Sequence, residues 1–137
     1  MAFQHGKSTD FRVDNSSGSL TDISAYCDQV EHPFDIDNPE TTTFGATSRR
    51  RQLVGLKDTT ITASGKWDPT LDGILTGIYG HATSKTYQVG PAGSTGGNVK
   101  YTGEMRLASY SVSNPVDGPV TWSATFEIDN DVSVTTY

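Results

Sequence analysis

Residues 120–128 alternate strictly between apolar and polar side chains, and this pattern limits what the chain can fold into more than any other feature. A period of two predicts a β-strand with one buried and one exposed face. Weaker alternation recurs at residues 11–14, 59–67, 87–89 and 99–107, with turn-forming residues between the runs. The sequence therefore predicts at least six strands. The apolar face of the final strand would carry Val120, Trp122, Ala124, Phe126 and Ile128.

Two segments depart from this alternation. Residues 20–34 have a mixed pattern that favours a strand with a bend near Ser24. A helix is predicted after Asp68, which suits the N-cap, with Pro69 in the first turn and Gly80 as the stop. We therefore predict a mostly β (α+β) sandwich of antiparallel sheets with one short flanking α-helix. The apolar stripe of the helix would be Leu71, Ile74, Leu75 and Ile78.

The chain has few residues with which to build a core. Leu, Ile, Val and Phe supply 27 of its 137 residues, which approaches the composition of disordered chains, but the formal net charge of −6 is too weak for one. We expect a single folded domain over residues 1–137, with a polar N-terminal arm at residues 1–10 and a polar C-terminal tail at residues 129–137. So thin a core suggests that neighbouring subunits supply part of the buried surface.

The charge and the single cysteine exclude several classes of protein. A net charge of −6 argues against a protein that grips nucleic acid or an anionic membrane surface. No apolar run is long enough for a membrane span, and the N-terminus lacks the apolar segment of a secretory signal. Cys27 alone forms neither an internal disulfide nor a multi-cysteine zinc site, and we interpret it as a small buried side chain. A protein made in a reducing cytoplasm fits best.

The groups able to carry chemistry do not form a recognisable site. His5, His32 and His81 lack the spacing of metal ligands. Residues 93–98 are rich in glycine, but no helix follows to supply phosphate-binding N–H groups, so we expect a hairpin tip. The acidic residues are interpreted as solvating charges rather than a catalytic pair. We therefore expect no enzyme activity, and no catalytic, cofactor-binding or metal-binding residues.

A long loop separates the early strands from the middle of the chain. Residues 35–53 have no core pattern, and such loops are usually functional or disordered. Acidic residues come first in the loop and an arginine block follows. The block is either solvated or docks on an acidic surface of an identical neighbour, a head-to-tail contact that builds rings and stacked polymers. The residues expected to contact other subunits or rings are Glu40, Phe44, Arg49, Arg50, Arg51 and Leu53.

Several short motifs follow one another between residues 10 and 128. They are DISAY at residues 22–26, ETTTFG at 40–45, GLKD at 55–58, GKWD at 65–68 and GPVTWSATF at 118–126. In this order they resemble the tail tube proteins (major tail proteins) of phages with long, non-contractile tails, especially those of actinobacterial phages.

The resemblance implies two roughly orthogonal sheets with a flanking helix, and hexameric rings whose inner sheets join into one β-barrel. The rings would stack into a virion tail tube through which DNA passes, with residues 36–54 contacting the adjacent ring. Assembly would take place in the host cytoplasm, with a tape-measure protein and a tail terminator as partners. An acidic protein suits such a conduit, because lumen groups that repel phosphate let DNA slide. The residues expected to line the lumen are Thr102, Glu104, Thr121, Ser123, Thr125 and Glu127.

Two alternatives stay open at this point. A tail terminator or a head–tail joining protein of similar fold would form a single ring and stop. A carbohydrate-binding β-sandwich would need an exposed aromatic platform, for which the candidates are Trp67, Tyr110 and Trp122.

Overall fold

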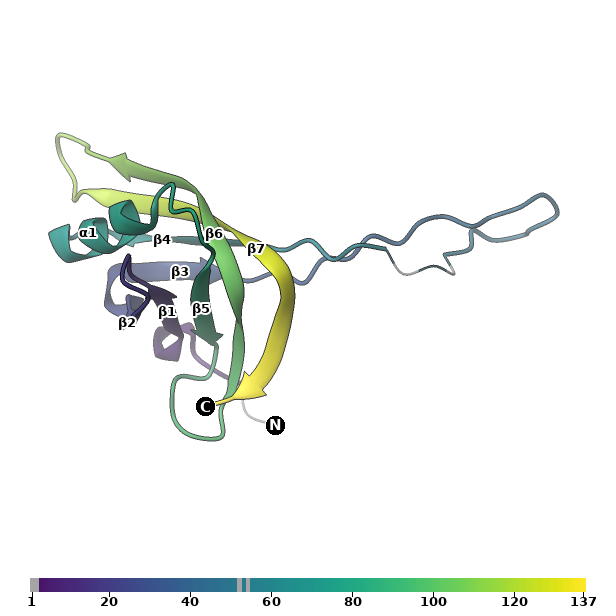
Figure 1. Ribbon diagram of the computed structural model, residues 1–137, viewed down its shortest axis with the longest axis horizontal. Helices are drawn as coiled ribbons and strands as arrows, with labels where there is room; N and C mark the ends of the chain where they lie inside the picture. Colours follow the sequence, from purple (N-terminus) through teal and green to yellow (C-terminus); the bar gives the residue numbers. More distant parts are fainter. Residues whose placement is uncertain (1–2, 52, 54) are drawn as a thin grey trace.

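The computed structural model describes residues 3–51, 53 and 55–137. In this part of the chain the strands form one antiparallel sheet of seven strands in the order β2-β1-β5-β6-β7-β4-β3 (Figure 1). The mostly β fold with a short α-helix, predicted from the sequence, is confirmed. The elements are η1 (Gly6–Ser8), β1 (Asp10–Asp14), β2 (Leu20–Asp22), η2 (Ser24–Tyr26), β3 (Cys27–Glu31), β4 (Thr60–Lys66), α1 (Pro69–Ile78), β5 (Lys85–Gly90), β6 (Val99–Ser113) and β7 (Thr121–Thr136).

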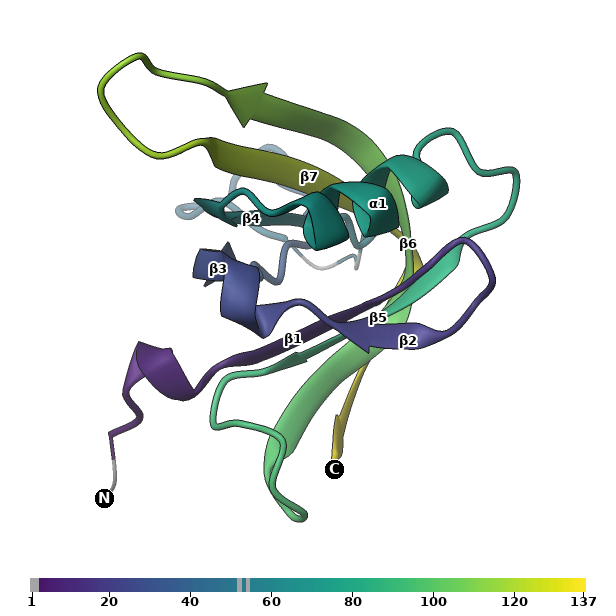
Figure 2. The same cartoon turned by 90° about the vertical axis from the view of Figure 1, so that its left-hand side faces the viewer.

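The sheet folds over itself because β6 and β7 are long enough to form strands of both of its halves. β5 pairs with residues 101–105 of β6, and β4 pairs with residues 121–127 of β7. β6 carries one bulge in each half, at Thr102/Glu104 and at Leu107/Ser109, and bulges bend a strand. The expected pair of packed sheets therefore consists of two layers of one continuous sheet, which cross each other in Figure 2.

We name the two layers after their middle strands. The β4 layer contains β3, β4, residues 121–127 of β7 and residues 107–113 of β6. The β5 layer contains β2, β1, β5 and the remaining parts of β6 and β7.

The core fills the angle between the two layers. Trp122 is buried and its Nε1 donates a hydrogen bond to the Tyr26 carbonyl oxygen at 2.9 Å, so this polar atom is satisfied. The rings of Phe126 and Phe11 meet edge to face, with their centroids 5.8 Å apart. The predicted inward face of the final strand is thus confirmed for Trp122, Ala124 and Phe126. The other buried hydrophobic residues are Val13, Ile23, Ile61, Ala63, Leu71, Leu75, Ile78, Tyr87, Val89 and Met105.

Helix α1 begins and ends where the sequence predicts. The Asp68 side chain accepts a hydrogen bond from the Thr70 N–H at 2.8 Å, and Gly80 has the left-handed φ of 70° that favours glycine after a helix. The predicted stripe faces the core, with Leu71, Leu75 and Ile78 buried. The helix therefore adds apolar surface to a body whose strands alone supply little.

The C-terminal tail is the clearest difference from the sequence prediction. Residues 129–136 are not a polar tail but the second half of β7, and they pair with β6 as far as Val99 opposite Thr136. Asn130 has a left-handed φ of 73°, and this polar residue interrupts the apolar alternation between Ile128 and Val132. At the other end, η1 and β1 occupy the expected N-terminal arm from Gly6 onward. The predicted bend near Ser24 is confirmed as η2.

Candidate assembly interface

Residues 35–57 form an arm that leaves the body after β3 and returns to β4 (Figure 1). At its base, Ile36 and Lys57 form an isolated antiparallel bridge, and the Asp37 N–H donates to the Leu56 carbonyl oxygen at 2.9 Å. Farther out, the Thr41 N–H donates to the Arg50 carbonyl oxygen at 2.8 Å. The arm is thus a narrow ribbon held mainly by backbone hydrogen bonds, and none of its described residues is buried.

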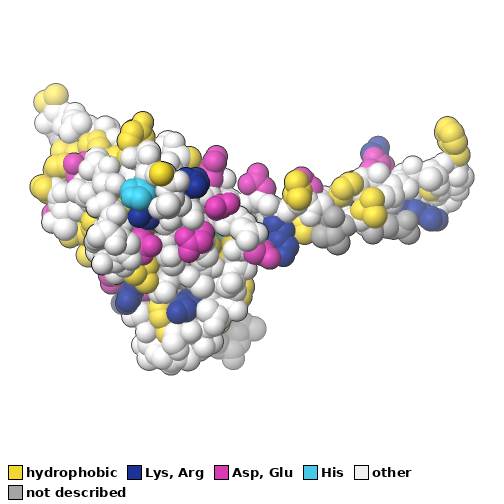
Figure 3. Space-filling view, viewed as in Figure 1, with side chains coloured by type: hydrophobic (Ala, Val, Ile, Leu, Met, Phe, Trp, Pro, Cys, Tyr) yellow, Lys and Arg dark blue, Asp and Glu magenta, His cyan; other side chains and the backbone are white. Residues whose placement is uncertain are grey.

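Large apolar side chains are exposed along this arm. Phe44, in the turn at the tip, is fully exposed, and Leu53 and Leu56 expose 60% and 81% of their surface. Figure 3 shows apolar side chains at the tip and near the base of the arm. Exposed apolar residues concentrated on one projection mark a surface that a partner covers.

The arm also carries the arginine block. Arg49, Arg50 and Arg51 are exposed, and Arg49 approaches Glu40 with 3.5 Å between Nη1 and Oε1. An exposed ion pair of this length contributes little to stability, so the arginines remain able to bind an acidic surface. The structure brings all six predicted contact residues onto one arm, namely Glu40, Phe44, Arg49, Arg50, Arg51 and Leu53.

An aromatic cluster that the sequence analysis missed fixes the start of the arm. His32 Nε2 lies 3.0 Å from the Tyr87 hydroxyl, and the His32 ring stacks obliquely against Phe34 and Tyr101. Burial lowers the pKa of His32, so the neutral ring is favoured. These aromatic residues come from three separate segments of the chain, and no sequence spacing would have revealed the cluster.

Next to this cluster lies an apolar groove, which we call the arm-base groove. Its lining comes from both ends of the arm, from the residues that flank these ends in the sequence, and from the second half of β7. An exposed ion pair between Lys57 and Asp131, with 3.2 Å between Nζ and Oδ1, stands at its rim. The lining residues are Phe34, Asp35, Ile36, Lys57, Thr59, Asn130, Asp131, Val132 and Val134.

The outer face of the β4 layer is rich in hydroxyl groups. Ser123 lies opposite Ser64 on β4 and Ser111 on β6, and Thr125 lies opposite Thr62. The six residues expected to line the lumen all point away from the core. They do not form one flat patch, because the bulges of β6 place Thr102 and Glu104 in the β5 layer and leave Thr121, Ser123, Thr125 and Glu127 in the β4 layer.

On each side of the β4 layer, the outermost strand has an edge, here called a margin, with which no described strand pairs. β3 is the last strand of the sheet, and on the other side β5 accompanies β6 only as far as Met105. Residues 107–113 of β6 therefore present a second margin. Uncovered margins pair readily with other strands, and proteins normally cover them.

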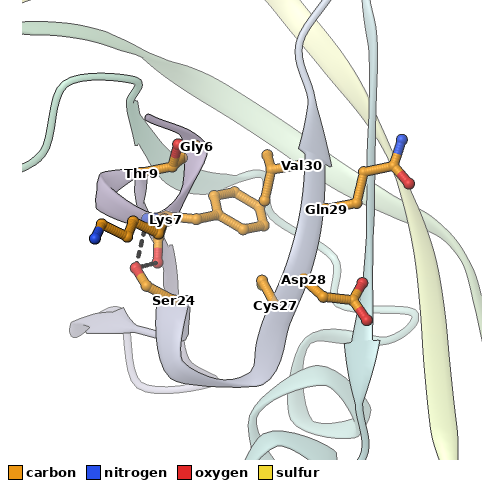
Figure 4. Close-up of a pocket in the computed structure, with 9 residues that line it drawn as sticks. Gly6, Lys7, Thr9, Ser24, Cys27, Asp28, Gln29 and Val30 are labelled. Atoms are coloured by element: carbon orange, nitrogen blue, oxygen red, sulfur yellow. Dashed lines mark hydrogen bonds between the residues drawn. The ribbon is translucent and has the colours of Figure 1, made fainter. Parts of the chain in front are cut away.

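A cleft of about 660 Å³ lies between η1, β1 and β3 (Figure 4). Cys27 and Val30 face this cleft, whereas the side chains of Asp28 and Gln29 point away from it. Burial, followed by the charges of Asp28 and Asp22, raises the pKa of Cys27 to about 12. The thiol therefore stays protonated and unreactive at neutral pH, as a small packing residue.

The described residues provide little for catalysis or carbohydrate stacking. Among them, no group of three or more His, Cys, Asp and Glu side chains is placed to hold a metal ion. Trp122 is 2% exposed and cannot stack on a sugar, and Trp67 and Tyr110 both donate hydrogen bonds to Asp72. No helix within the described part of the chain has the length and apolar composition to cross a membrane.

In a comparison with protein-family models, residues 3–134 match the phage tail tube protein model. The chain belongs to the phage tail tube protein family. As a member of this family, it is a structural, tube-forming protein of the virion tail. No curated protein sequence matches this tail tube protein.

Solved structures show the same fold. The tail of an empty gene transfer agent particle, solved with C6 symmetry, superposes with a TM-score of 0.81 at 16% identity, covering 97% of this chain and 99% of the other. The SPP1 tail tube gives 0.74 at 12% identity, with 98% and 80% covered. The sheath–tube complex of an extracellular contractile injection system gives 0.61 at 16% identity, with 93% and 88% covered. The family predicted from the sequence is thus confirmed, and so is the fold.

Proposed function

We propose that this tail tube protein closes into hexameric rings, that the rings stack into a tube, and that double-stranded DNA passes through the lumen. The observation that carries the proposal is the combination of two uncovered margins on one layer with an exposed arm outside the body. The margins supply contacts within a ring and the arm supplies contacts between rings. The C6 symmetry of the gene transfer agent tail, which has the same fold, supports six copies per ring.

Within a ring, β3 of one copy pairs with residues 107–113 of β6 in the next copy. The two margins lie on opposite sides of the β4 layer, so each copy offers one margin to each neighbour. Such a heterologous contact closes into a ring when its rotation matches the number of copies. The joined layers form a barrel, which leaves no uncovered edge on the β4 layer within the ring.

In this barrel the hydroxyl-rich outer face of the β4 layer lines the lumen, with Thr121, Ser123, Thr125 and Glu127 toward the DNA. The cations on this face have acidic neighbours: Lys66 Nζ lies 3.4 Å from Asp28 Oδ2, and Arg106 lies opposite Glu127. A face on which acidic residues accompany the cations holds phosphates weakly, so DNA slides past it. Thr102 and Glu104 stand beyond the bend of β6, where the lumen surface turns toward the adjacent ring.

The arm reaches the adjacent ring through Phe44, Leu53 and the arginine block, with Glu40 orienting Arg49. A tape-measure protein that occupies the lumen during assembly and a terminator that stops stacking complete the expected partners, and assembly takes place in the host cytoplasm. This chain is not expected to bind a membrane or to catalyse a reaction.

Sedimentation velocity over a series of protein concentrations tests this proposal. A tube subunit gives species that grow without limit as the concentration rises, because every added ring presents a fresh set of arms. A terminator or head–tail joining protein stops at one ring. A single boundary at the size of one ring, at all concentrations, would replace the tube assignment by one of those two.

A further inference from the structure

The arm-base groove is an apolar site open to solvent. Three of the apolar residues that line it, Phe34, Ile36 and Val134, expose 56%, 41% and 62% of their surface. Its volume is about 290 Å³. A cavity of about 150 Å³ already accommodates benzene, so the groove has room for an aromatic side chain.

Phe44 is an aromatic side chain that its own chain leaves uncovered. It sits beside Gly45, whose φ of 87° allows the sharp turn at the tip, and its side chain is fully exposed. It lies nine positions after the groove residue Asp35, a span of about 30 Å in extended chain. Phe44 therefore cannot fold back into the groove of its own chain while the arm remains extended as in Figure 1.

We propose that Phe44 of one copy inserts into the arm-base groove of a second copy in the adjacent ring. The proposal rests on the tube function proposed above and names the receiving site for the arm. A second copy displaced along the arm by about one arm length brings its own arm base to the tip of the first. The tip and the groove are different surfaces, so the contact repeats from ring to ring without closing on itself, as a growing tube requires.

The charges around the two surfaces are complementary. The arginine block lies on the returning side of the arm, and Arg50 is tied by backbone hydrogen bonding to Thr41 on the other side. The groove is bordered by Asp35 and by Asp131, which pairs with Lys57, and Figure 3 shows that acidic side chains outnumber basic ones where the arm meets the body. Basic groups near the tip therefore meet acidic groups near the base, and such pairing fixes the register of the contact.

Cysteine cross-linking tests this contact directly. All variants carry Cys27→Ala, so that the native thiol takes no part, and this parent must form tubes. Phe44→Cys and Val134→Cys are combined in one chain, and the assembled protein is oxidised and separated without reductant. We expect a ladder of dimers, trimers and longer multimers, because each copy links forward through residue 44 and backward through residue 134. A bond within one chain would give only monomers.

A matched variant tests whether the turn between β6 and β7, rather than Phe44, occupies the groove. Val116, in the β6–β7 turn, is also fully exposed, and it lies at the end of the body opposite to the arm (Figure 1). Val116→Cys with Val134→Cys should give no ladder. Two results would overturn the groove assignment while leaving tube formation intact. One is a ladder from this pair. The other is a Phe44→Cys, Val134→Cys variant that forms tubes but gives only monomers on the gel after oxidation. Absence of tubes from the Cys27→Ala parent would contradict the proposed function itself.

A substitution that needs no cross-linking tests the same contact if the new thiols disturb stacking. Val134→Lys places a charge in the groove at a position that is already exposed, so the monomer should fold as before. We expect rings that no longer stack, whereas Val116→Lys should stack normally. Normal tubes from Val134→Lys would contradict the proposal.

Discussion

The hydroxyl of Tyr137, the residue that follows β7, donates a hydrogen bond to Asp10 Oδ2 at the start of β1, with 2.8 Å between the oxygens. Asp10 is 6% exposed and also accepts from Arg12 Nε at 2.9 Å. The contact joins the first and last strands of the chain and holds the end of β7 against the β5 layer. Burial, and then the neighbouring Asp10, raise the pKa of Tyr137, so the hydroxyl remains a donor at neutral pH.

Replacing Tyr137 by Phe should therefore lower the free energy of unfolding by about 1–3 kcal/mol, the usual cost of leaving a buried carboxylate with one partner fewer. Urea denaturation measures it. Tyr79→Phe is the matched control, because Tyr79 is 68% exposed and should change little. Equal stability of Tyr137→Phe and the parent would show that the hydrogen bond contributes nothing.

Trp122 and Phe126 should be the costliest positions of the core. Truncating either to Ala should destabilise the monomer by about 3–5 kcal/mol, since both are buried in the angle between the layers. Trp122→Phe keeps most of the packing but removes the donor to the Tyr26 carbonyl, and should cost about 1–3 kcal/mol. A thermal scan in which Trp122→Ala melts with the parent would place this residue outside the core.

Stability should fall in mildly acidic solution through His32. Its pKa is lowered in the folded state, so the unfolded chain binds the proton more readily, and stability falls as the pH drops from about 6.5, the ordinary value for histidine. The contribution is fully present above that pH. Denaturation at pH 7.5 and at pH values below 6.5 should show this loss, and His32→Gln should show a smaller one. An unchanged pH dependence in His32→Gln would mean that other groups cause it.

Reversing the charge of the arginine block should separate folding from stacking. Replacing Arg49, Arg50 and Arg51 by Glu should leave the thermal unfolding of the monomer in place, since all three are exposed. It should reduce the yield of tubes about tenfold or more, because like charges at an interface cost several kcal/mol. Replacing the same three by Lys keeps the charge and should retain most stacking. Full tube yield from the Glu variant, seen in electron micrographs, would refute a role for the block.

The local rules of the sequence predicted the elements whose side chains face the core. Trp122 and Phe126 follow a strict alternation, and Asp68 and Gly80 bracket the helix with residues specific to its ends. The second half of β7 was missed because Asn130 and its acidic neighbours Asp129 and Asp131 interrupt the apolar alternation, whereas the strand continues through backbone pairing with β6. Two separate sheets were expected for a similar reason, because the bulges that bend one sheet into two layers leave no signal in the apolar pattern.

The arm was recognisable because residues 35–53 have no core pattern, but the groove at its base was not. Phe34 and Val134 are a hundred residues apart in the chain and meet only through the sheet topology. The order of the exposed residues along the arm could be predicted, whereas the surface that receives them depends on the tertiary fold.

Electron microscopy of the purified protein over a range of concentrations tests the central claim most directly, which is that this chain covers its strand margins only by joining identical copies around a lumen. We predict hollow tubes that lengthen as the concentration rises, with a central hole in end-on views. Particles that remain single, compact monomers up to millimolar concentration would contradict it.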